Sequence, residues 1–565
     1  MAGRTIVSVT PDLALEAGNT YAGGLGVLEG DKFYAAAKIG LDYRVLTLLY
    51  GNGYVDYELD AEGNPVPRPQ PQPEEFLRSL RVGDEFKVRV RGEEVSVQAL
   101  ELAEGSARAV FFSPTSPEWA VRAAERLYIE EGPEQGFLKY VLLARASEAY
   151  IRRDVGLDSV AFVDLQEAYT ALLPLSLRLP GKYRMVVHTA GPWGHPTFPR
   201  EYFASEYGYS FAEEKVPLTE IGLSLARQAF AVSAKHMDVL SRVFPHHSWK
   251  MGYVTNGVNL DRWMDAEARS RYEDLNLDRF ISLRERLRRS LVDLIARYKD
   301  VDPGRRMIVV WARRLAPYKR PEFAARLASE LGDAPLFFVL GGKPHPRDGA
   351  GLEAMRLFAR LHRERENVVY VPNYGIREAK VILGGGDVLL FTPFSGWEAC
   401  GTSYMKAGVN GVPSIASRDG GALEFIVDGV NGWFFGEDLR NMVDYGGEEG
   451  RRISEAEYAQ LRDALLRVHR MYSEDPESFH RVGLNALRSF ATRASMERVL
   501  REYYPELLGL AARPHAPAFT SNSLSCSDRR LLASSPSPSS SATSRQTFTL
   551  YMHPGSGPIT SPVYP

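Results

Sequence analysis

Short apolar runs recur along this chain, and each is separated from the next by a longer segment with helical periodicity. In the second half the runs lie at residues 306–314, 335–342, 367–372 and 387–393. Runs this short that lack a polar face are typical of parallel strands buried on both sides, and parallel strands need a long connection between them. The alternation predicts an α/β protein whose parallel sheets are covered by helices.

The first half repeats this alternation. Apolar runs at 5–10, 42–50 and 183–189 predict strands. The stretch 23–40 starts with glycines and continues with helical periodicity, so it predicts a tight turn followed by a helix. Residues 86–102 alternate with a period of two around the turn RGEE, which predicts a β-hairpin excursion.

Two such blocks predict two Rossmann-like domains that face a cleft. We expect the first domain to span residues 1–275 and the second to span 276–512. The second starts with an amphipathic helix at 281–300, and we expect the helices of 453–508 to pack across it and back toward the first. Strand carboxyl ends and helix amino ends face such a cleft, so it is the natural ligand site.

The composition changes at about Arg513. Serine and proline dominate residues 513–565, and no helix or strand period continues there. A segment of this composition cannot bury enough apolar surface to offset the entropy of ordering it. We therefore predict a disordered tail.

The overall composition excludes several classes of protein. Hydrophobic residues make up 44% of the chain and charged residues 25%, with a net charge of −3, as in ordinary globular proteins. This charge gives no reason to expect nucleic acid or an anionic membrane as a partner. A helix that spans a membrane needs about 18 apolar residues, and no apolar run approaches this length. The chain has two cysteines, too few for a disulfide framework. We expect a cytoplasmic protein and predict no metal site.

A cluster of cations follows the apolar run 306–311. The loop ARRLAPYKR, 312–320, carries Arg313, Arg314, Lys319 and Arg320. A solvated charged face is one interpretation. The other is an anion site at the carboxyl end of a strand, because guanidinium groups match the oxygens of phosphate.

Five further positions have both a structural and a functional interpretation. Gly23 and Gly24 form either an ordinary turn or a phosphate cradle at a helix start. Asn256 belongs either to an Asn-Gly turn or to a sugar site. His188 and Tyr374 follow strand-like runs, where each is either a packing residue or a ligand contact.

Lys406 stands in the small, apolar stretch EACGTSYMKAGVNG, 398–411. One interpretation is a surface lysine whose alkyl stem lies along apolar residues. The other is a buried amine with a lowered pKa that forms a Schiff base.

Taken together, these segments resemble the α-glucan phosphorylases, most closely the short prokaryotic and archaeal type. The matching blocks are YAGGLGVLEGDKFYAAAKIG, GYVTNGVNLDRW, ARRLAPYKRPEF, GGKPHP and EACGTSYMKAGVNG, in the family's order up to about residue 440. The last block resembles the family's pyridoxal-phosphate lysine motif and is the most specific. The resemblance implies a GT-B type glycosyltransferase fold.

The resemblance also implies roles for individual residues. Lys406 would form the Schiff base with pyridoxal 5′-phosphate. The cofactor phosphate would be surrounded by Gly23, Gly24, Tyr374 and Thr402. The substrate phosphate would be bound by Arg314 and Lys319, with Arg313 close by as a cofactor-binding residue. The glucose would be contacted by His188, Asn256 and Glu398, and lined by the backbone around Gly401.

The implied reaction is retaining phosphorolysis, in which α-1,4-glucan and inorganic phosphate give glucose 1-phosphate and a shortened glucan. The family uses the phosphate of its cofactor, pressed against the substrate phosphate. Two phosphates this close repel each other unless cations lie beside them, and the 312–320 loop would supply those cations. A homodimer is common in the family.

A rival resemblance lies after the lysine motif. Residues 413–438, PSIASRDGGALEFIVDGVNGWFFGED, are similar to nucleotide-sugar glycosyltransferases such as glycogen synthases. Those enzymes carry a Glu-x7-Glu motif whose second glutamate binds the sugar nucleotide. Here Glu398 is followed eight residues later by Lys406, which favours the phosphorylase.

Two departures from the phosphorylase pattern leave a third hypothesis. The family's HLNEGH-like block is replaced by DLQEAY, 164–169, so both histidines are lost, and Cys400 replaces a serine. The sequence therefore also allows a glucan-binding or regulatory protein that turns over poorly.

Overall fold

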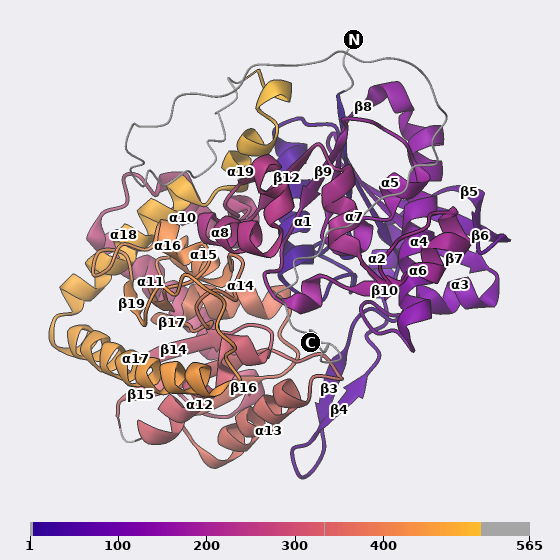
Figure 1. The fold of residues 1–565 in the computed structure, drawn as a ribbon. Coiled ribbons are helices and arrows are strands. Elements are labelled where there is room, and N and C mark those ends of the chain that lie inside the picture. The colour runs from indigo at the N-terminus through magenta and orange to yellow at the C-terminus, as the bar shows by residue number, and fades with distance from the viewer. Residues whose placement is uncertain (1–3, 333, 510–565) are drawn as a thin grey trace, which may run out of the picture.

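The computed structural model describes residues 4–332 and 334–509. The predicted tail, 513–565, lies outside the described residues. Two parallel sheets, each flanked by helices, form the two halves of the molecule (Figure 1). The predicted α/β class is therefore confirmed.

The first sheet has nine strands in the order β13-β12-β9-β8-β1-β2-β7-β6-β5. Strands β13 to β7 are parallel, and β6 and β5 continue the sheet in antiparallel fashion at one edge. Their bounds are β1 (Thr5–Val9), β2 (Tyr43–Leu48), β5 (Arg81–Val90), β6 (Glu93–Glu104), β7 (Ala107–Ser116), β8 (Val160–Gln166), β9 (Tyr183–Val186), β12 (Gln228–Ala231) and β13 (Met251–Tyr253).

The expected hairpin at 86–102 lies in β5 and β6, and it is part of the main sheet. The reason is β7, which pairs with β6 on one side and with β2 on the other. A separate two-stranded hairpin, β3 (Asp56–Leu59) and β4 (Pro65–Arg68), projects from this half toward the other (Figure 1). A second short pair is formed by β10 (Thr197–Pro199) and β11 (Lys215–Pro217).

The second sheet has six strands, all parallel, in the order β16-β15-β14-β17-β18-β19. Every residue of β14 is buried, because helices cover both faces of a parallel sheet. The bounds are β14 (Met307–Ala312), β15 (Leu336–Gly341), β16 (Val368–Val371), β17 (Val388–Phe391), β18 (Ser414–Ser417) and β19 (Trp433–Phe435).

Helices connect the strands of both sheets. In the first half and the connection they are α1 (Gly24–Lys38), α2 (Glu74–Ser79), α3 (Glu118–Ala123), α4 (Pro133–Tyr150), α5 (Leu173–Ser176), α6 (Arg200–Tyr207), α7 (Leu218–Leu225), α8 (Ala234–Val243), α9 (Leu260–Trp263), α10 (Ala266–Arg271) and α11 (Leu277–Tyr298). In the second half they are α12 (Pro321–Glu330), α13 (Gly349–Glu364), α14 (Ile376–Gly385), α15 (Ser403–Gly408), α16 (Ala422–Phe425), α17 (Glu448–Glu474), α18 (Pro476–Arg493) and α19 (Met496–Tyr503). The domain boundary at 275/276 stays a prediction.

The final helix α19 returns to the first half of the molecule, where it packs against α1. Its end is held by polar contacts: Arg184 of β9 donates to the carbonyl of Tyr503 at 2.7 Å, and the Tyr504 hydroxyl donates to Asp164 of β8 at 2.5 Å. The chain therefore crosses between its two halves twice, once near α11 and once before α19.

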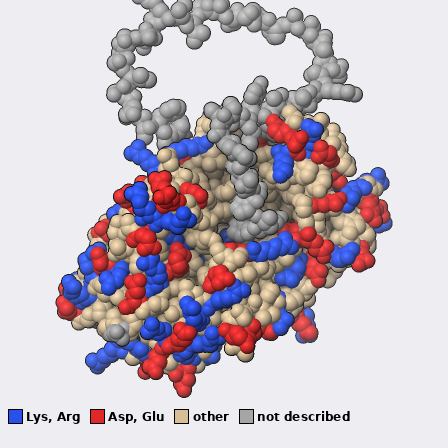
Figure 2. Space-filling view, turned by 60° about the horizontal axis from the view of Figure 1, so that its bottom comes forward, with Lys and Arg blue, Asp and Glu red and all other residues tan. Residues whose placement is uncertain are grey.

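None of the helices in residues 4–332 and 334–509 combines the length and the apolar character needed to cross a membrane. Figure 2 shows lysine and arginine interspersed with aspartate and glutamate over the face that it draws. No patch of a single charge sign dominates that face, in keeping with the small net charge.

Candidate functional site

A cavity of about 1950 Å³, including its open mouth, is lined by residues of both halves of the molecule. Eleven of the twelve site residues named from the sequence line it: Gly23, Gly24, His188, Arg313, Arg314, Lys319, Tyr374, Glu398, Gly401, Thr402 and Lys406. Asn256 is not among the lining residues. The structure thus brings together segments that are almost 400 residues apart in the chain.

The amino end of α1 opens into the cavity. Gly23 caps this 15-residue helix with an extended backbone, and neither Gly23 nor Gly24 has a positive φ. A Cβ at either position would meet nothing within 4 Å, so turn geometry does not require glycine here. Open space at a helix amino end suits an anion, because the free N–H groups and the helix dipole point toward it.

Lys406 lies on α15, and only 8% of it is exposed. Its Nζ lies 4.1 Å from the centroid of the Trp263 ring and forms no ion pair within the described part of the chain. Burial lowers the pKa of this amine to about 8, with nearby Asp31 opposing the shift. The surface interpretation is therefore wrong, and the amine loses its proton more easily than an ordinary lysine does.

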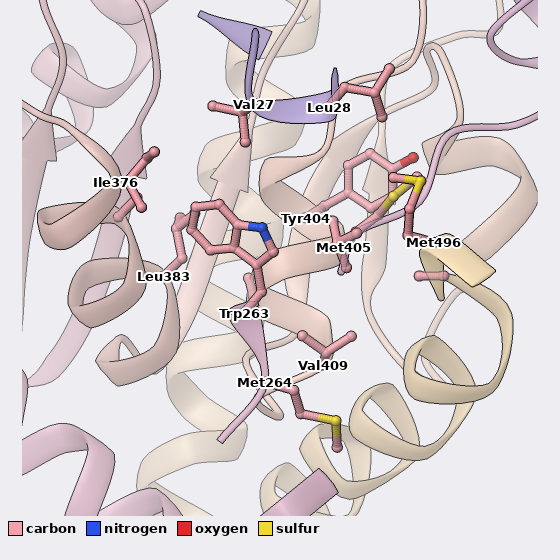
Figure 3. Packing of buried hydrophobic residues seen from close by; sticks show 14 of the residues in the cluster. Val27, Leu28, Trp263, Met264, Ile376, Leu383, Tyr404, Met405, Val409 and Met496 are labelled. Atoms are coloured by element: carbon pink, nitrogen blue, oxygen red, sulfur yellow. The ribbon is translucent and has the colours of Figure 1, made fainter. Parts of the chain in front are cut away.

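Trp263 forms a wall beside this amine. It ends α9, and its Nε1 donates to both carboxylate oxygens of Asp31 at 2.9 Å. Figure 3 shows the indole among apolar side chains of α1, α14 and α15, including Val27, Leu383 and Met405. These contacts fix the ring, and with it the space open to Lys406.

The segment TNGVNLDRW thus contributes Trp263 to the cavity, while Asn256 lies outside the lining. Asn256 is 7% exposed, its N–H donates to the carbonyl of Val232 at 3.1 Å, and its Oδ1 is buried without a partner. The only sequence signal for Trp263 was its place at the end of a short capped helix. No local pattern showed that its side chain faces the cavity.

Arg313, Arg314 and Lys319 surround Glu398. Nη2 of Arg313 donates to Glu398 Oε2 at 2.6 Å, and Lys319 Nζ lies 3.3 Å from the same oxygen. Nε and Nη1 of Arg313 are buried without partners. Arg314 forms no ion pair with any described carboxylate. Three cations therefore meet one carboxylate, which leaves spare positive charge and unused donors for an anion.

Burial sets the protonation of this cluster. It lowers the pKa of Lys319 to about 7, and neighbouring Arg313 lowers it further while Glu398 opposes the shift. Burial raises the pKa of Glu398, but Lys319 and Arg313 together hold it below its usual value. Glu398 is thus an anion near neutral pH, and the solvated-face interpretation of the loop does not hold for these residues.

The fourth cation of the loop points elsewhere. Arg320 has a left-handed backbone, φ +52°, and its guanidinium pairs with buried Glu457 at 2.5 Å. It also donates to the carbonyls of Thr392 and Pro393. Arg320 therefore stabilises the packing of α17 on the second sheet and is not part of the cavity.

Strand β9 ends at Val186, two residues before His188, where the sequence places the end. Sheet pairing stops because the His188 N–H donates to Glu167 Oε2 at 3.0 Å and not to a neighbouring strand. The imidazole Nε2 lies 2.8 Å from Gln166 Oε1. Both partners belong to the block DLQEAY: Glu167 matches the family block, and Gln166 is a departure from it that contacts the predicted sugar site.

Glu167 itself faces the cavity. Its Oε2 also accepts from Thr189 Oγ1 at 3.0 Å, while its Oε1 is buried without a partner. Burial raises the pKa of this carboxyl to about 8. It is thus mainly protonated at neutral pH, and sequence reasoning missed it as a candidate because it looked only for the lost histidines.

Two further predicted residues, Gly401 and Thr402, line the cavity and follow Cys400 in the chain. Gly401 has φ +75°, and a Cβ there would lie 2.6 Å from the Phe391 ring, so only glycine fits. Thr402 precedes α15 as its N-terminal cap residue. Cys400 is buried, and burial raises the pKa of its thiol to about 12, so this thiol is inert.

An aromatic stack crosses the cleft and was not expected from the sequence. Trp193, from the first half, stacks on Trp397 with ring centroids 5.5 Å apart and on Tyr318 at 5.2 Å. Its partners immediately precede Glu398 and Lys319. A Cβ on Gly191 would clash with the indole at 2.4 Å, so the glycine allows the ring to fold back over its own backbone.

Comparisons with known proteins agree with this arrangement. A family model described as glycosyl transferases group 1 matches residues 296–442. These residues hold all six strands of the second sheet, and the match supports the predicted GT-B type fold. The chain is 24% identical to a maltodextrin phosphorylase of Thermococcus litoralis, over 86% of this chain and 68% of the relative. It is 25% identical to a glycogen phosphorylase of Aquifex aeolicus, over 86% and 83%. It is also 25% identical to an uncharacterised protein of Methanocaldococcus jannaschii, over 86% and 96%.

Proposed function

We propose that this chain, which is related to the glycogen and maltodextrin phosphorylases, is an α-1,4-glucan phosphorylase that uses pyridoxal 5′-phosphate. The observation that carries the proposal is one cavity that holds both a lysine amine without an ion pair and a surplus of buried cations. The substrates would be α-1,4-glucan and inorganic phosphate, and the product glucose 1-phosphate.

The residues present fit the cofactor. Lys406 offers an amine that burial keeps easily deprotonated, and the wall of Trp263 beside it is apolar. Gly23 and Gly24 leave a space at the amino end of α1 that an anionic group would fill. When bound, the cofactor supplies a phosphate group beside the reacting phosphate.

The chain's own residues would then act on the substrates. Arg314 and Lys319 bind the substrate phosphate, and the unused donors of Arg313 stabilise the charge of two neighbouring phosphates. Lys319, whose pKa is about 7, takes up a proton when a dianion arrives. Glu398 is released from its cations as phosphate binds them, which frees it to accept a hydrogen bond from a glucose hydroxyl.

Contacts across the cleft exclude water from this chemistry, where hydrolysis would compete. Lys235 of α8 reaches the second half, where it donates to Ser395 Oγ at 2.6 Å and to the carbonyl of Arg418 at 2.9 Å. On the other side, the N–H of Tyr57 on the β3–β4 hairpin donates to Asn373 at 2.8 Å.

A nucleotide-sugar-dependent glucan synthase of the same fold is the second candidate. The match of residues 296–442 to group 1 glycosyl transferases favours it. The structure places Lys406, and not a carboxylate, in the cavity eight residues after Glu398, which does not suit a sugar nucleotide whose ribose hydroxyls need an acceptor.

One assay separates the two candidates. The purified chain, loaded with pyridoxal phosphate, is incubated with maltoheptaose and inorganic phosphate, and in parallel with maltoheptaose and UDP-glucose or ADP-glucose. We expect glucose 1-phosphate to form in the first reaction and no chain extension in the second. Extension from a sugar nucleotide, with no glucose 1-phosphate from phosphate, would overturn the proposal in favour of the synthase.

We further expect Arg314→Ala to raise the KM for phosphate and for glucose 1-phosphate roughly 10- to 100-fold, because it removes charged hydrogen bonds to the anion. The KM for maltoheptaose should change little. Steady-state kinetics in both directions measure this, with Arg326→Ala as the control, since Arg326 lies on the surface of α12 just beyond the same loop. A variant impaired only toward glucan would show that the anion site lies elsewhere.

A further inference from the structure

A buried polar chain runs from the core of the first half to His188 in the cavity. The Tyr43 hydroxyl donates to Glu29 at 2.6 Å, and Glu29 pairs with Lys32 at 3.2 Å. Both members of this pair are at most 1% exposed. Lys32 Nζ next lies 3.4 Å from Gln166 Oε1, and this oxygen lies 2.8 Å from His188 Nε2.

The chain fixes the direction of the Gln166 amide. An ammonium group has donors and no acceptor, so the amide atom that faces Lys32 must be the carbonyl oxygen. The amide nitrogen then faces Ser8 Oγ, 3.0 Å away, and a hydroxyl accepts its hydrogen bond. The Ser8 hydroxyl can donate or accept, so it permits both orientations of the amide. The reversed amide would set its NH₂ group against the Lys32 ammonium, so Lys32 selects the orientation with the carbonyl oxygen toward it.

The direction of the amide fixes the tautomer of His188. A carbonyl oxygen only accepts, so the imidazole Nε2 must carry the proton. The other nitrogen, Nδ1, has no partner among the described residues, and it is not one of the fully buried atoms. Since His188 lines the cavity, Nδ1 is the ring nitrogen that a ligand can reach.

Resting on the proposed function, we infer that Lys32 and Gln166 are positioning residues that hold His188 as its Nε2–H tautomer, so that Nδ1 accepts a hydrogen bond from a hydroxyl of the bound sugar. Burial, Lys32 and His236 all hold the pKa of His188 well below its usual value, so the ring stays neutral. A bare Nδ1 attracts hydroxyl groups and repels the oxygens of a phosphate dianion. One side of the cavity, at His188, thereby suits a sugar hydroxyl, and another side, at Arg314, suits an anion.

The first test uses the unmodified sequence and needs no catalysis. Long-range ¹H–¹⁵N spectra of histidine-labelled protein distinguish the two tautomers, and His188→Asn identifies the His188 signals. We expect a protonated Nε2 and a bare Nδ1 at pH 7. Added glucose should shift the Nδ1 resonance, while inorganic phosphate alone should not. A protonated Nδ1, or an Nδ1 that responds to phosphate and not to glucose, would overturn the inference.

The second test removes the group that selects the amide. In Lys32→Met the amide is free to reverse, so we expect both tautomers of His188 and a KM for maltoheptaose about three- to tenfold higher. Lys38→Met is the matched control, because Lys38 lies on the same helix with its side chain 51% exposed. One unchanged tautomer in Lys32→Met would refute the role of Lys32. A chain with the expected tautomer that makes no glucose 1-phosphate would refute the proposed function alone.

Discussion

Replacement of Lys406 by alanine is expected to abolish covalent attachment of pyridoxal phosphate and to reduce phosphorolysis to background. The cavity contains three lysines, but Lys319 is paired with Glu398 and Lys343 with Asp56 at 2.7 Å. Lys406 has no carboxylate partner among the described residues, and burial lowers its pKa to about 8. A lysine whose pKa is lowered and whose amine is not held by a carboxylate is the one best placed to react with an aldehyde.

The measurement is an absorbance spectrum after incubation with pyridoxal phosphate, followed by borohydride reduction and peptide mapping. The unmodified sequence should show a pyridoxal-type band and carry the reduced adduct on Lys406. Lys343→Ala is the matched control, since it removes another buried lysine of the same cavity and should leave labelling of Lys406 intact. An active, colourless Lys406→Ala variant, or an adduct on Lys319, would contradict the assignment.

Replacement of Asp164 by alanine is expected to destabilise the protein by about 3–5 kcal/mol, the usual cost of leaving a buried charge without its partner. Asp164 accepts two hydrogen bonds from Arg184, at 2.7 and 2.8 Å, and both side chains are at most 3% exposed. The Tyr504 hydroxyl donates to the same carboxylate. The loss should therefore also loosen α19 from the first sheet.

Chemical denaturation measures the free energy of unfolding, and hydrogen exchange measures protection of residues 496–504. Glu58→Ala is the matched control, because Glu58 pairs with Arg68 at the same 2.8 Å but the two side chains are 66% and 52% exposed. Its loss should change stability by about 1 kcal/mol or less. Equal losses of unfolding free energy in the two variants would mean that the buried Asp164–Arg184 pair stabilises the protein no more than an exposed ion pair does. The double variant Asp164→Leu with Arg184→Met should recover stability, since it leaves no unpaired charge.

Asp164 also explains one departure noted in the sequence. It occupies the position of one of the two histidines that the family block carries and this chain lacks. In the structure Asp164 does not line the cavity and belongs to the core. The change reaches the site at Gln166, through His188, and at Tyr169, which replaces the second histidine and lines the cavity.

In the second half, the strands found from the sequence carry short apolar runs. The runs at 306–314 and 335–342 contain β14 and β15, whose residues are all buried. Strand β8, VAFVDLQ, was missed because Asp164 and Gln166 break its run, although every residue in it is buried. Their partners Arg184, Lys32 and Ser8 lie on other elements, so no local pattern marks them as core residues.

The candidate site likewise has residues that were named from the sequence and residues that only the structure revealed. The resemblance named Lys406 and the cationic loop, and the structure places both on one cavity. It did not name Trp263 or Trp193, because an aromatic side chain near a strand end is as often packing as function. Nor did it show that Arg313 faces the cavity while Arg320 turns away through a left-handed residue.

The sequence by itself determined the α/β class and the alternation of strands and helices, because apolar periodicity is a local property that each segment displays alone. Only the tertiary structure decided which polar side chains are buried as partners and which are left with unused donors and acceptors. A buried polar group is stable only where distant elements supply its hydrogen bonds. Arg184 finds those partners and holds the fold together, whereas Nε and Nη1 of Arg313 are buried without a partner in the described part of the chain.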